Sequence, residues 1–243
     1  MCTNYTPSSR DRLRATRLGL AHLPEADWPR EVYPGYEAPI LVRGGAPGQH
    51  DVAPRCLLAR FGLVPRWSRD AAHAKELSRH TTNARSETAA VKPSFRSPWR
   101  DRHWALAPME NFFEPCWETG RAVRWRIARA DGDLFAAAGL WERWPDPASG
   151  EVTASFALLT VNADAHPLMA RMHRPGDEKR MPVLLAPDDF EVWLHATDEQ
   201  AHALVRKMPV VPLTGEPAPR ESPPRTARRV PPAPVPDDTQ SLF

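Results

Sequence analysis

The sequence predicts an α+β fold: a curled, mostly antiparallel sheet or barrel with short helices at its periphery. Four strand candidates follow one another between residues 103 and 162, without the regular alternation of strands and helices that a parallel sheet requires. The helical candidates are short. The 243 residues are 42% hydrophobic, which is enough for one sizeable core.

The first hundred residues predict short elements separated by turns. Residues 11–20 could form one short helix, 38–42 a strand and 56–65 a buried strand. Residues 71–78 are typical of a helical turn or two. The stretch 97–102 suggests another short helix, with Ser97 as its N-cap and Pro98 in its first turn.

The middle of the chain holds the strongest strand patterns, at residues 103–109, 123–129, 134–144 and 154–162. In the second of these, Val123, Trp125 and Ile127 alternate with polar positions, as in a half-buried strand. Residues 181–185 predict a last strand and 187–195 a helix. Thr197 and Gln200 form a capping box that opens a helix through residue 207.

Composition changes after residue 212. Eight of the 28 prolines lie in residues 213–243, where large apolar residues are few. Such a segment cannot bury enough apolar surface to fold by itself. We therefore expect one domain over residues 1–212 and a Pro-rich, disordered tail over 213–243.

Charge is unevenly distributed along the chain. The net charge is +2, but residues 55–104 hold 11 Lys/Arg against 4 Asp/Glu, and the remainder holds 21 against 26. A basic segment on a mildly acidic body is a footprint for a polyanion. A solvated face whose arginines pair with carboxylates from elsewhere is an equally valid interpretation of the counts.

Several classes of protein are not supported by the sequence. No stretch approaches the ~20 apolar residues of a membrane span, and the first residues lack the apolar core of a secretory signal. Three cysteines without metal-type spacing suit a reducing cytoplasm rather than a disulfide framework. With no metal cluster or Gly-rich phosphate loop in the sequence, we expect no cofactor.

The chain begins Met1-Cys2. Removal of Met1, which a small second residue permits, would give Cys2 a free α-amine beside its thiol. Reference pKa values of about 7.7–8.0 and about 8.5 leave both groups partly nucleophilic near neutral pH. Together they can capture an aldehyde as a Schiff base that closes to a thiazolidine ring. The alternative is an incidental, frayed terminus.

Further motifs follow in a fixed order and cover roughly residues 1–195. They are GLVPRW (62–67), NARSET (83–88), NFFEP (111–115), AGLW (138–141), His173 and RMPVLL (180–185). With Met1-Cys2 they resemble the SRAP family, named for SOS-response-associated peptidases and known for crosslinking abasic sites in DNA.

The resemblance implies a role for each of four residues. Cys2 would be the nucleophile on the open-chain aldehyde of an abasic sugar, and Asn83 would hydrogen-bond near Cys2 or the sugar. Glu114 would handle protons at the Cys2 amine, and His173 would act as a general acid in ring opening. Each also has a structural alternative, such as a turn for Asn83, and His166 competes with His173.

The DNA-binding surface implied by the resemblance centres on Arg85, which would contact a phosphate beside the lesion. Lys92, Arg96 and Arg100 could extend it, and Trp67 and Trp99 could stack on unpaired bases of single-stranded DNA. The tryptophans could equally belong to the core.

The chain departs from the family pattern at three places. Thr3-Asn4 stands where Gly-Arg is usual, which removes a basic residue. Pro115 stands where Trp is usual, and residues 174–179 lengthen the connection from His173 to the RMP motif. We expect retained chemistry with altered DNA contacts.

The leading hypothesis is therefore an enzyme-like abasic-site sensor: a cytoplasmic, nucleoid-associated monomer without cofactor that crosslinks single-stranded DNA through Cys2. A lyase activity is related, because a Schiff base at the same carbon permits β-elimination. The alternative from another class is a thiol peptidase or autopeptidase using Cys2, His173 and Asn83. A non-catalytic single-strand-binding module is the third hypothesis.

Overall fold

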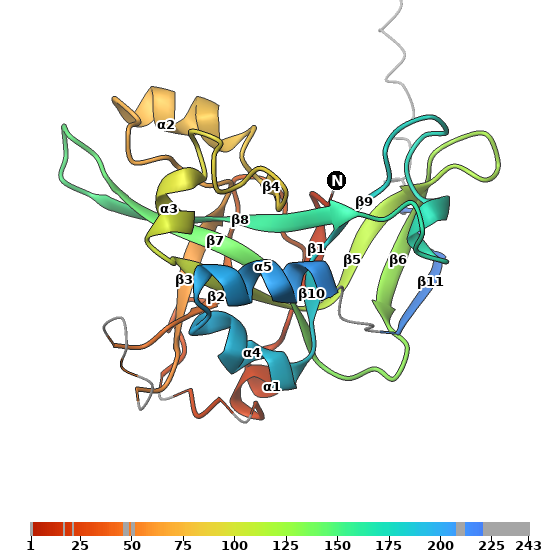
Figure 1. Ribbon diagram of the computed structural model, residues 1–243, viewed down its shortest axis with the longest axis horizontal. Coiled ribbons are helices and arrows are strands. Elements are labelled where there is room, and N and C mark those ends of the chain that lie inside the picture. Colours follow the sequence, from red (N-terminus) through yellow and green to blue (C-terminus); the bar gives the residue numbers. More distant parts are fainter. Residues whose placement is uncertain are drawn as a thin grey trace, which may run out of the picture.

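The computed structural model describes residues 2–16, 18–20, 22–45, 49, 52–207 and 212–220. Strands make up most of the regular secondary structure, as Figure 1 shows. The strands are β1 (Tyr5–Pro7), β2 (Glu37–Val42), β3 (Arg55–Phe61), β4 (Asn83–Arg85), β5 (Trp104–Cys116), β6 (Val123–Arg129), β7 (Phe135–Pro145), β8 (Val152–Asn162), β9 (Arg180–Pro182), β10 (Leu184–Leu185) and β11 (Leu213–Pro217).

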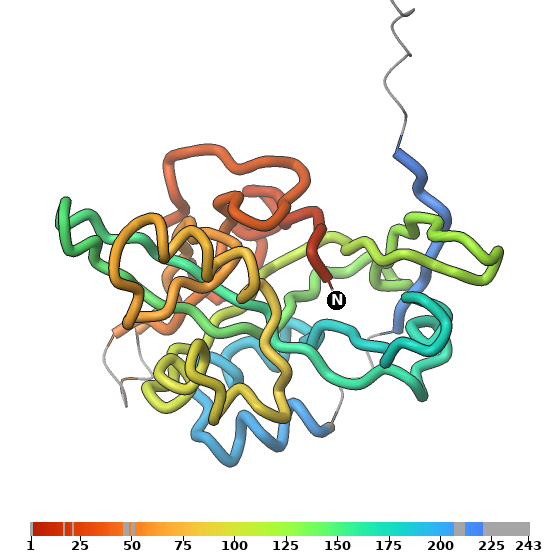
Figure 2. The backbone as a smooth tube through the Cα atoms, turned by 90° about the horizontal axis from the view of Figure 1, so that it is seen from above, coloured from red at the N-terminus to blue at the C-terminus, as the bar shows by residue number. Residues whose placement is uncertain are grey.

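The helices are short and lie around the sheet (Figure 2). They are α1 (Arg10–Arg14), α2 (Ala71–Ser78), α3 (Arg96–Arg100), the 3-10 turn η1 (Met169–Arg171), α4 (Pro187–Leu194) and α5 (Asp198–Lys207). None of the described helices is long and apolar enough to cross a bilayer.

Five strands close into a barrel. The hydrogen-bonded order runs β7, β8, β3, β2, β5 and back to β7, with β3 and β8 parallel and the other pairs antiparallel. β10 pairs with β7, while β4 and β9 pair with β8. The α+β prediction with a curled, mostly antiparallel sheet or barrel is confirmed.

Strand β5 connects the barrel to an outlying ribbon. Its first half pairs with β7 inside the barrel, and its second half leaves with β6 and β1. β11 then pairs along the far side of β6. The length of β5, which continues well beyond the predicted 103–109, places Glu114 outside the barrel wall, at the side where β1 joins.

The core fills the barrel and the space beneath α4 and α5. Trp104 packs edge-on against Trp99 and donates its indole N–H to the Ala196 carbonyl at 2.9 Å. Gly139 is required for close strand packing, because a Cβ there would lie 2.5 Å from the Ala157 carbonyl oxygen.

Several predicted elements differ from the structure. Helix α3 begins one residue before Ser97, and its N-cap is Phe95, so the predicted Ser97 cap is wrong. The predicted strand 181–185 is two strands, because the chain crosses at Val183 from β8 to β7: the Val183 N–H donates to Leu159, and its carbonyl accepts from Ala138.

The tail boundary is also corrected. Residues 213–217 form β11, whose backbone pairs with β6 over its whole length, so sheet structure continues past residue 212. Gly215 fits here because a Cβ would lie 3.2 Å from Leu168 and Trp125 side-chain atoms. The rest of the predicted tail, residues 221–243, lies outside the described residues.

Candidate active site

Strand β1 positions the amino-terminal Cys2. It pairs antiparallel with β5, with Tyr5 opposite Phe112, and the Phe113 N–H donates to the Asn4 carbonyl at 2.9 Å. Continuing this register brings Cys2 alongside the end of β5, where Glu114 lies. The Cys2 side chain is fully buried, so this end of the chain is part of the core rather than frayed.

Asn83 holds the backbone of Cys2 from across the site. It lies in β4, which pairs parallel with β8, and its Nδ2 donates to the Cys2 carbonyl at 2.8 Å. Figure 1 shows the amino terminus beside the tip of β4. The Asn83 Oδ1 is buried and has no hydrogen-bond donor among the described residues, so its capacity to accept a hydrogen bond is unused.

Glu114 is a buried carboxylic acid beside Cys2. Its side chain is 1% exposed, and this burial raises its pKa to about 7. The cause is desolvation, which disfavours the charged form. Burial, and secondarily the Glu114 charge, raises the pKa of the Cys2 thiol well above its ordinary value. The thiol is therefore protonated until a base receives its proton.

His173 reaches Glu114 from the loop after η1. A bridge between Met172 and Cys116 and a 2.7 Å hydrogen bond from the His173 N–H to the Pro115 carbonyl tie this loop to β5. His173 has φ +62°, an uncommon conformation for a residue with a side chain. The backbone turn brings its Nδ1 to 3.6 Å from Oε2 of Glu114.

The second ring nitrogen of His173 identifies its tautomer. Nε2 lies 3.0 Å from the Arg180 carbonyl, which can only accept, so Nε2 carries the proton. Burial lowers the pKa of His173, which favours the neutral ring. In that form Nδ1 is unprotonated and faces Glu114. The two groups can therefore exchange a proton near neutral pH.

Arg180 supports this arrangement, although it was not among the residues predicted for the site. Its guanidinium is buried, makes two 2.9 Å bonds to Glu87 and one of 2.8 Å to Glu178, and donates to the Thr160 carbonyl. Its own carbonyl orients His173. The sequence contains a signal for this ion pair, because Glu87 lies in the NARSET motif and Arg180 begins the RMPVLL motif.

The structure places the predicted DNA-binding residues on and beside segment 85–100, which alternates between exposed and buried residues. Arg85 ends β4 and pairs with Glu178 at 2.9 Å. Lys92 and Arg96 are exposed, and Trp67 is 47% exposed, with its indole N–H directed to the Pro93 carbonyl.

The two other residues predicted for the DNA-binding surface differ in exposure. Arg100 is exposed. Trp99 is buried in the core, and its indole donates to Asp198, so stacking on a base by Trp99 is excluded. His166, the competitor of His173, accepts the Leu168 and Met169 backbone N–H groups through Nδ1. It therefore stabilises the start of η1.

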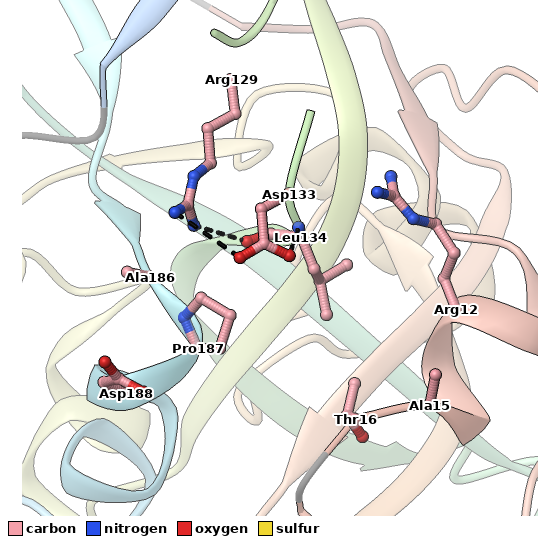
Figure 3. A pocket seen from close by; sticks show the side chains of 9 residues that line it. All are labelled: Arg12, Ala15, Thr16, Arg129, Asp133, Leu134, Ala186, Pro187 and Asp188. Atoms are coloured by element: carbon pink, nitrogen blue, oxygen red, sulfur yellow. Dashed lines mark hydrogen bonds and ion pairs between the residues drawn. The ribbon is translucent and has the colours of Figure 1, made fainter. Parts of the chain in front are cut away.

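One cavity adjoins the site and another lies away from it. One, of about 270 Å³, adjoins Glu114 and is lined by Asn4, Phe113 and Arg124 among others. Another, of about 510 Å³, lies between α1, the β6–β7 turn and the start of α4 (Figure 3). Its Arg129 pairs with Asp131 and Asp133, and none of the predicted site residues lines it.

Metal binding is not indicated by the side chains present. Within the described part of the chain, no three His, Cys, Asp or Glu side chains gather as a metal site would require.

Comparison with known proteins identifies the family. Residues 1–218 match the family described as SOS response associated peptidase (SRAP). The chain belongs to the SRAP family. A crystal structure of a protein from Bordetella bronchiseptica has 32% sequence identity and a TM-score of 0.77, and the match covers 89% of this chain and 99% of that one. A Bacteroides thetaiotaomicron structure, at 22% identity and a TM-score of 0.69 over 88% of this chain and 90% of that one, shares the fold.

Named relatives are similar over part of their length. The Bacillus subtilis "Abasic site processing protein YoqW" is 31% identical over 139 residues, which is 56% of this chain and 55% of that protein. The Pongo abelii "Abasic site processing protein HMCES" is 25% identical over 219 residues, 73% of this chain and 58% of that protein. This SRAP chain thus spans about half the length of the curated relatives it matches.

Proposed function

We propose that this SRAP protein processes abasic sites in single-stranded DNA by forming a covalent crosslink through Cys2. One observation carries the proposal: the structure gathers a buried amino-terminal cysteine, an amide on its carbonyl and a carboxylic acid that titrates near neutrality. The names of the relatives as abasic site processing proteins support the same substrate class.

The reaction needs only groups that Cys2 itself supplies once Met1 is removed. The free α-amine adds to the C1 aldehyde of the open sugar and expels one water, giving a Schiff base. The thiol sulfur then adds to the imine carbon, and its proton ends on the nitrogen. The product is a thiazolidine, and the net change is loss of one water, with no oxidation or reduction.

Glu114 and His173 supply the proton transfers in this proposal. Charged Glu114 accepts a proton from the ammonium or thiol, which makes the nucleophile available. Protonated, it returns the proton to the departing hydroxyl. Neutral His173, whose Nδ1 faces Glu114, relays the proton and assists ring opening. The Oδ1 of Asn83 would accept a hydrogen bond from the N–H of the protonated Schiff base or from a sugar hydroxyl.

The exposed basic segment supports single-stranded DNA as the partner. Arg85, next to Asn83 in β4, would hold a phosphate beside the lesion, with Lys92 and Arg96 along the same segment. Trp67 presents an exposed ring on which an unpaired base can stack. A monomer acting in the cytoplasm at the nucleoid is part of this proposal.

The contacts favour this chemistry over a Cys-His-Asn peptidase. Asn83 binds the Cys2 carbonyl, whereas the ring nitrogens of His173 face Glu114 and the Arg180 carbonyl. In a Cys-His-Asn set the amide would orient the histidine. An amino-terminal extension separates the two activities, because aldehyde capture needs the free α-amine and thiol hydrolysis does not.

The test is a crosslinking assay with the full chain. The protein is mixed with a single-stranded oligonucleotide carrying one abasic site and run on a denaturing gel, after mass spectrometry has confirmed loss of Met1. We expect a shifted band that Cys2→Ala abolishes, and that an extended amino terminus also abolishes. Cys56→Ser, a change at a half-buried cysteine, is the matched control and should keep the band.

The absence of a shifted band from processed wild-type protein would reject the proposal. Persistence of the band in Cys2→Ala would assign the crosslink to another nucleophile.

A further inference from the structure

We propose that the cavity beside Asn4 and the paired ends of β5 and β6 is a phosphate-binding pocket, in which Arg124 and Arg220 hold a DNA backbone phosphate flanking the lesion. This inference rests on the proposed function and names a contact that the sequence analysis did not predict. The pocket has a volume of about 270 Å³ and is lined by Asn4, Phe113, Glu114, Pro115, Arg124 and Arg220, together with Ala122.

The pocket lies next to the nucleophile. The Asn4 side chain lines it, and Asn4 is two residues from Cys2. Two residues span at most about 7 Å. The Asn4 carbonyl is also hydrogen-bonded to Phe113, the neighbour of Glu114 on β5. A sugar joined to Cys2 would therefore have its own phosphates within reach of this cavity.

The Arg124 side chain is fixed in place at the pocket wall by several contacts. Its guanidinium lies 3.4 Å from the centre of the Phe113 ring, and its Nη2 donates to Oδ1 of Asn4 at 2.8 Å and to Glu31 at 2.9 Å. Nη1 makes one bond, of 3.3 Å, to the Ala218 carbonyl. That leaves one N–H of Nη1 for a ligand, on a side chain that loses little freedom when it binds.

Arg220 brings a second cation to the same cavity. Its guanidinium lies 5.1 Å from the centre of the Tyr33 ring, and its Nη2 donates to the Tyr33 hydroxyl at 2.9 Å. Within the described residues it has no carboxylate partner. The pairing of β11 with β6 places Arg220 at this cavity, because the Ala218 N–H continues the hydrogen-bond ladder by donating to the Arg124 carbonyl.

The charge balance at this pocket favours an anion. Two arginines face two acids. Glu31 is charged: although partial burial raises its pKa, hydrogen bonds from Tyr33, Arg124 and Asn4 lower it overall. Burial raises the pKa of Glu114 to about 7, so this carboxyl is only partly charged at neutral pH and positive charge is in excess. Arginine forks match the geometry of phosphate oxygens. Position 4 itself is neutral, so Arg124 supplies from β6 the cation that the amino-terminal strand lacks.

Binding without crosslinking tests the pocket directly. A single-stranded oligonucleotide with a tetrahydrofuran abasic analogue has no aldehyde, so fluorescence anisotropy gives an equilibrium Kd at several salt concentrations. We expect Arg220→Gln and Arg124→Gln each to weaken binding several-fold and to reduce the slope of log K against log salt by about 0.7, the value for one phosphate on a single strand.

Arg126→Gln is the matched control, since it removes the same charge from β6 at an exposed residue paired with Glu216. It should leave Kd and the slope unchanged. Arg124→Lys keeps the charge and should keep most of the slope. Arg220 is exposed, so Arg220→Gln keeps the test valid even if loss of the Arg124 contacts loosens β1.

Replacing single phosphates by neutral methylphosphonates identifies the ligand. A methylphosphonate at one position flanking the lesion should weaken binding by the wild-type protein. The same substitution should not further weaken binding by Arg220→Gln, because that variant has already lost the contact. Two results would contradict the proposed phosphate-binding pocket. One is an unchanged salt slope in both Arg124→Gln and Arg220→Gln; the other is an equal loss of affinity in all proteins at every substituted phosphate. Crosslinking of the reactive oligonucleotide by wild type, measured in parallel, tests the proposed function separately.

Discussion

His173 Nδ1 lies 3.6 Å from Oε2 of Glu114, although the residues are 59 positions apart in the chain. The contact exists because the loop after η1 bridges to the end of β5 at Met172 and Cys116. Burial raises the pKa of Glu114 to about 7 and lowers the pKa of His173 below its ordinary value. A carboxyl that titrates near neutrality beside a neutral imidazole suits proton transfer at neutral pH.

The crosslinking rate should depend on the ionisation of Glu114. Burial raises the pKa of this carboxyl to about 7, so its basic form accumulates as the pH rises through that value. We expect the single-turnover rate to rise about tenfold per pH unit below pH 7 and to level off above it. Glu114→Gln should be slower and lack this inflection. An unchanged inflection in the variant would assign it to another group.

Ionisation of Glu114 should also lower the free energy of unfolding. Its pKa is 4.5 ordinarily and about 7 in the folded protein, so the folded state binds the proton more tightly and loses stability as the pH rises from about 4.5 through 7. Glu114→Gln should therefore gain up to about 3 kcal/mol in unfolding free energy relative to wild type between pH 5 and pH 8. Urea unfolding at both pH values measures this, and an equal difference at both would contradict it.

Asn83→Ala should slow crosslinking without preventing folding. The variant loses the 2.8 Å bond that fixes the Cys2 carbonyl, so the amine and thiol sample more orientations. We expect a rate loss of about 10- to 100-fold. Asn162→Ala changes an exposed asparagine on the neighbouring strand β8 and should retain the wild-type rate. Equal rates in the two variants would remove Asn83 from the site.

Glu178→Gln should tighten DNA binding. Glu178, in the loop that lengthens the connection after His173, lies 2.9 Å from Arg85 and competes with a phosphate for that arginine. The pair lies at the surface, where such interactions are weak, so we expect about two- to fivefold lower Kd for single-stranded DNA. Asp177→Asn alters the same charge one residue away and should have a smaller effect. Equal changes would indicate only a general charge effect.

Truncation should show where the folded domain ends. A chain ending at residue 212 lacks β11 and its pairing with β6. We expect a loss of about 2 kcal/mol, which lowers Tm by about 4–8 °C for a chain of this size. A chain ending at residue 220 keeps β11 and should melt like the full-length protein. Identical Tm values for both truncations would show that β11 contributes nothing.

Local patterns predicted local structure well. Residues 71–78 form α2 and residues 123–129 form β6 with the predicted bounds, because helix and strand periodicity is a property of neighbouring residues. The capping box at Thr197 and Gln200 is also present, with both reciprocal bonds. The family was evident from the motif order.

Elements that depend on distant partners were missed. The division of 181–185 and the strand β11 are set by which neighbour each segment meets, and a Pro-rich composition does not report that β6 has an open edge. The Ser97 cap was wrong because the turns before α3 already satisfy its first N–H groups: Arg96 donates to Lys92 and Trp99 to Phe95.

The order of residues is enough to list the reactive groups that the protein carries: an amino-terminal cysteine, an amide, a carboxylic acid and an imidazole. It does not reveal that Asn83 binds the Cys2 carbonyl, that Glu114 is buried enough to titrate near pH 7, or that Arg124 lies beside Asn4; these follow from the folded arrangement. pKa values and ion pairs depend on burial and on neighbours in space. Strand register, rather than proximity in the chain, supplies those neighbours.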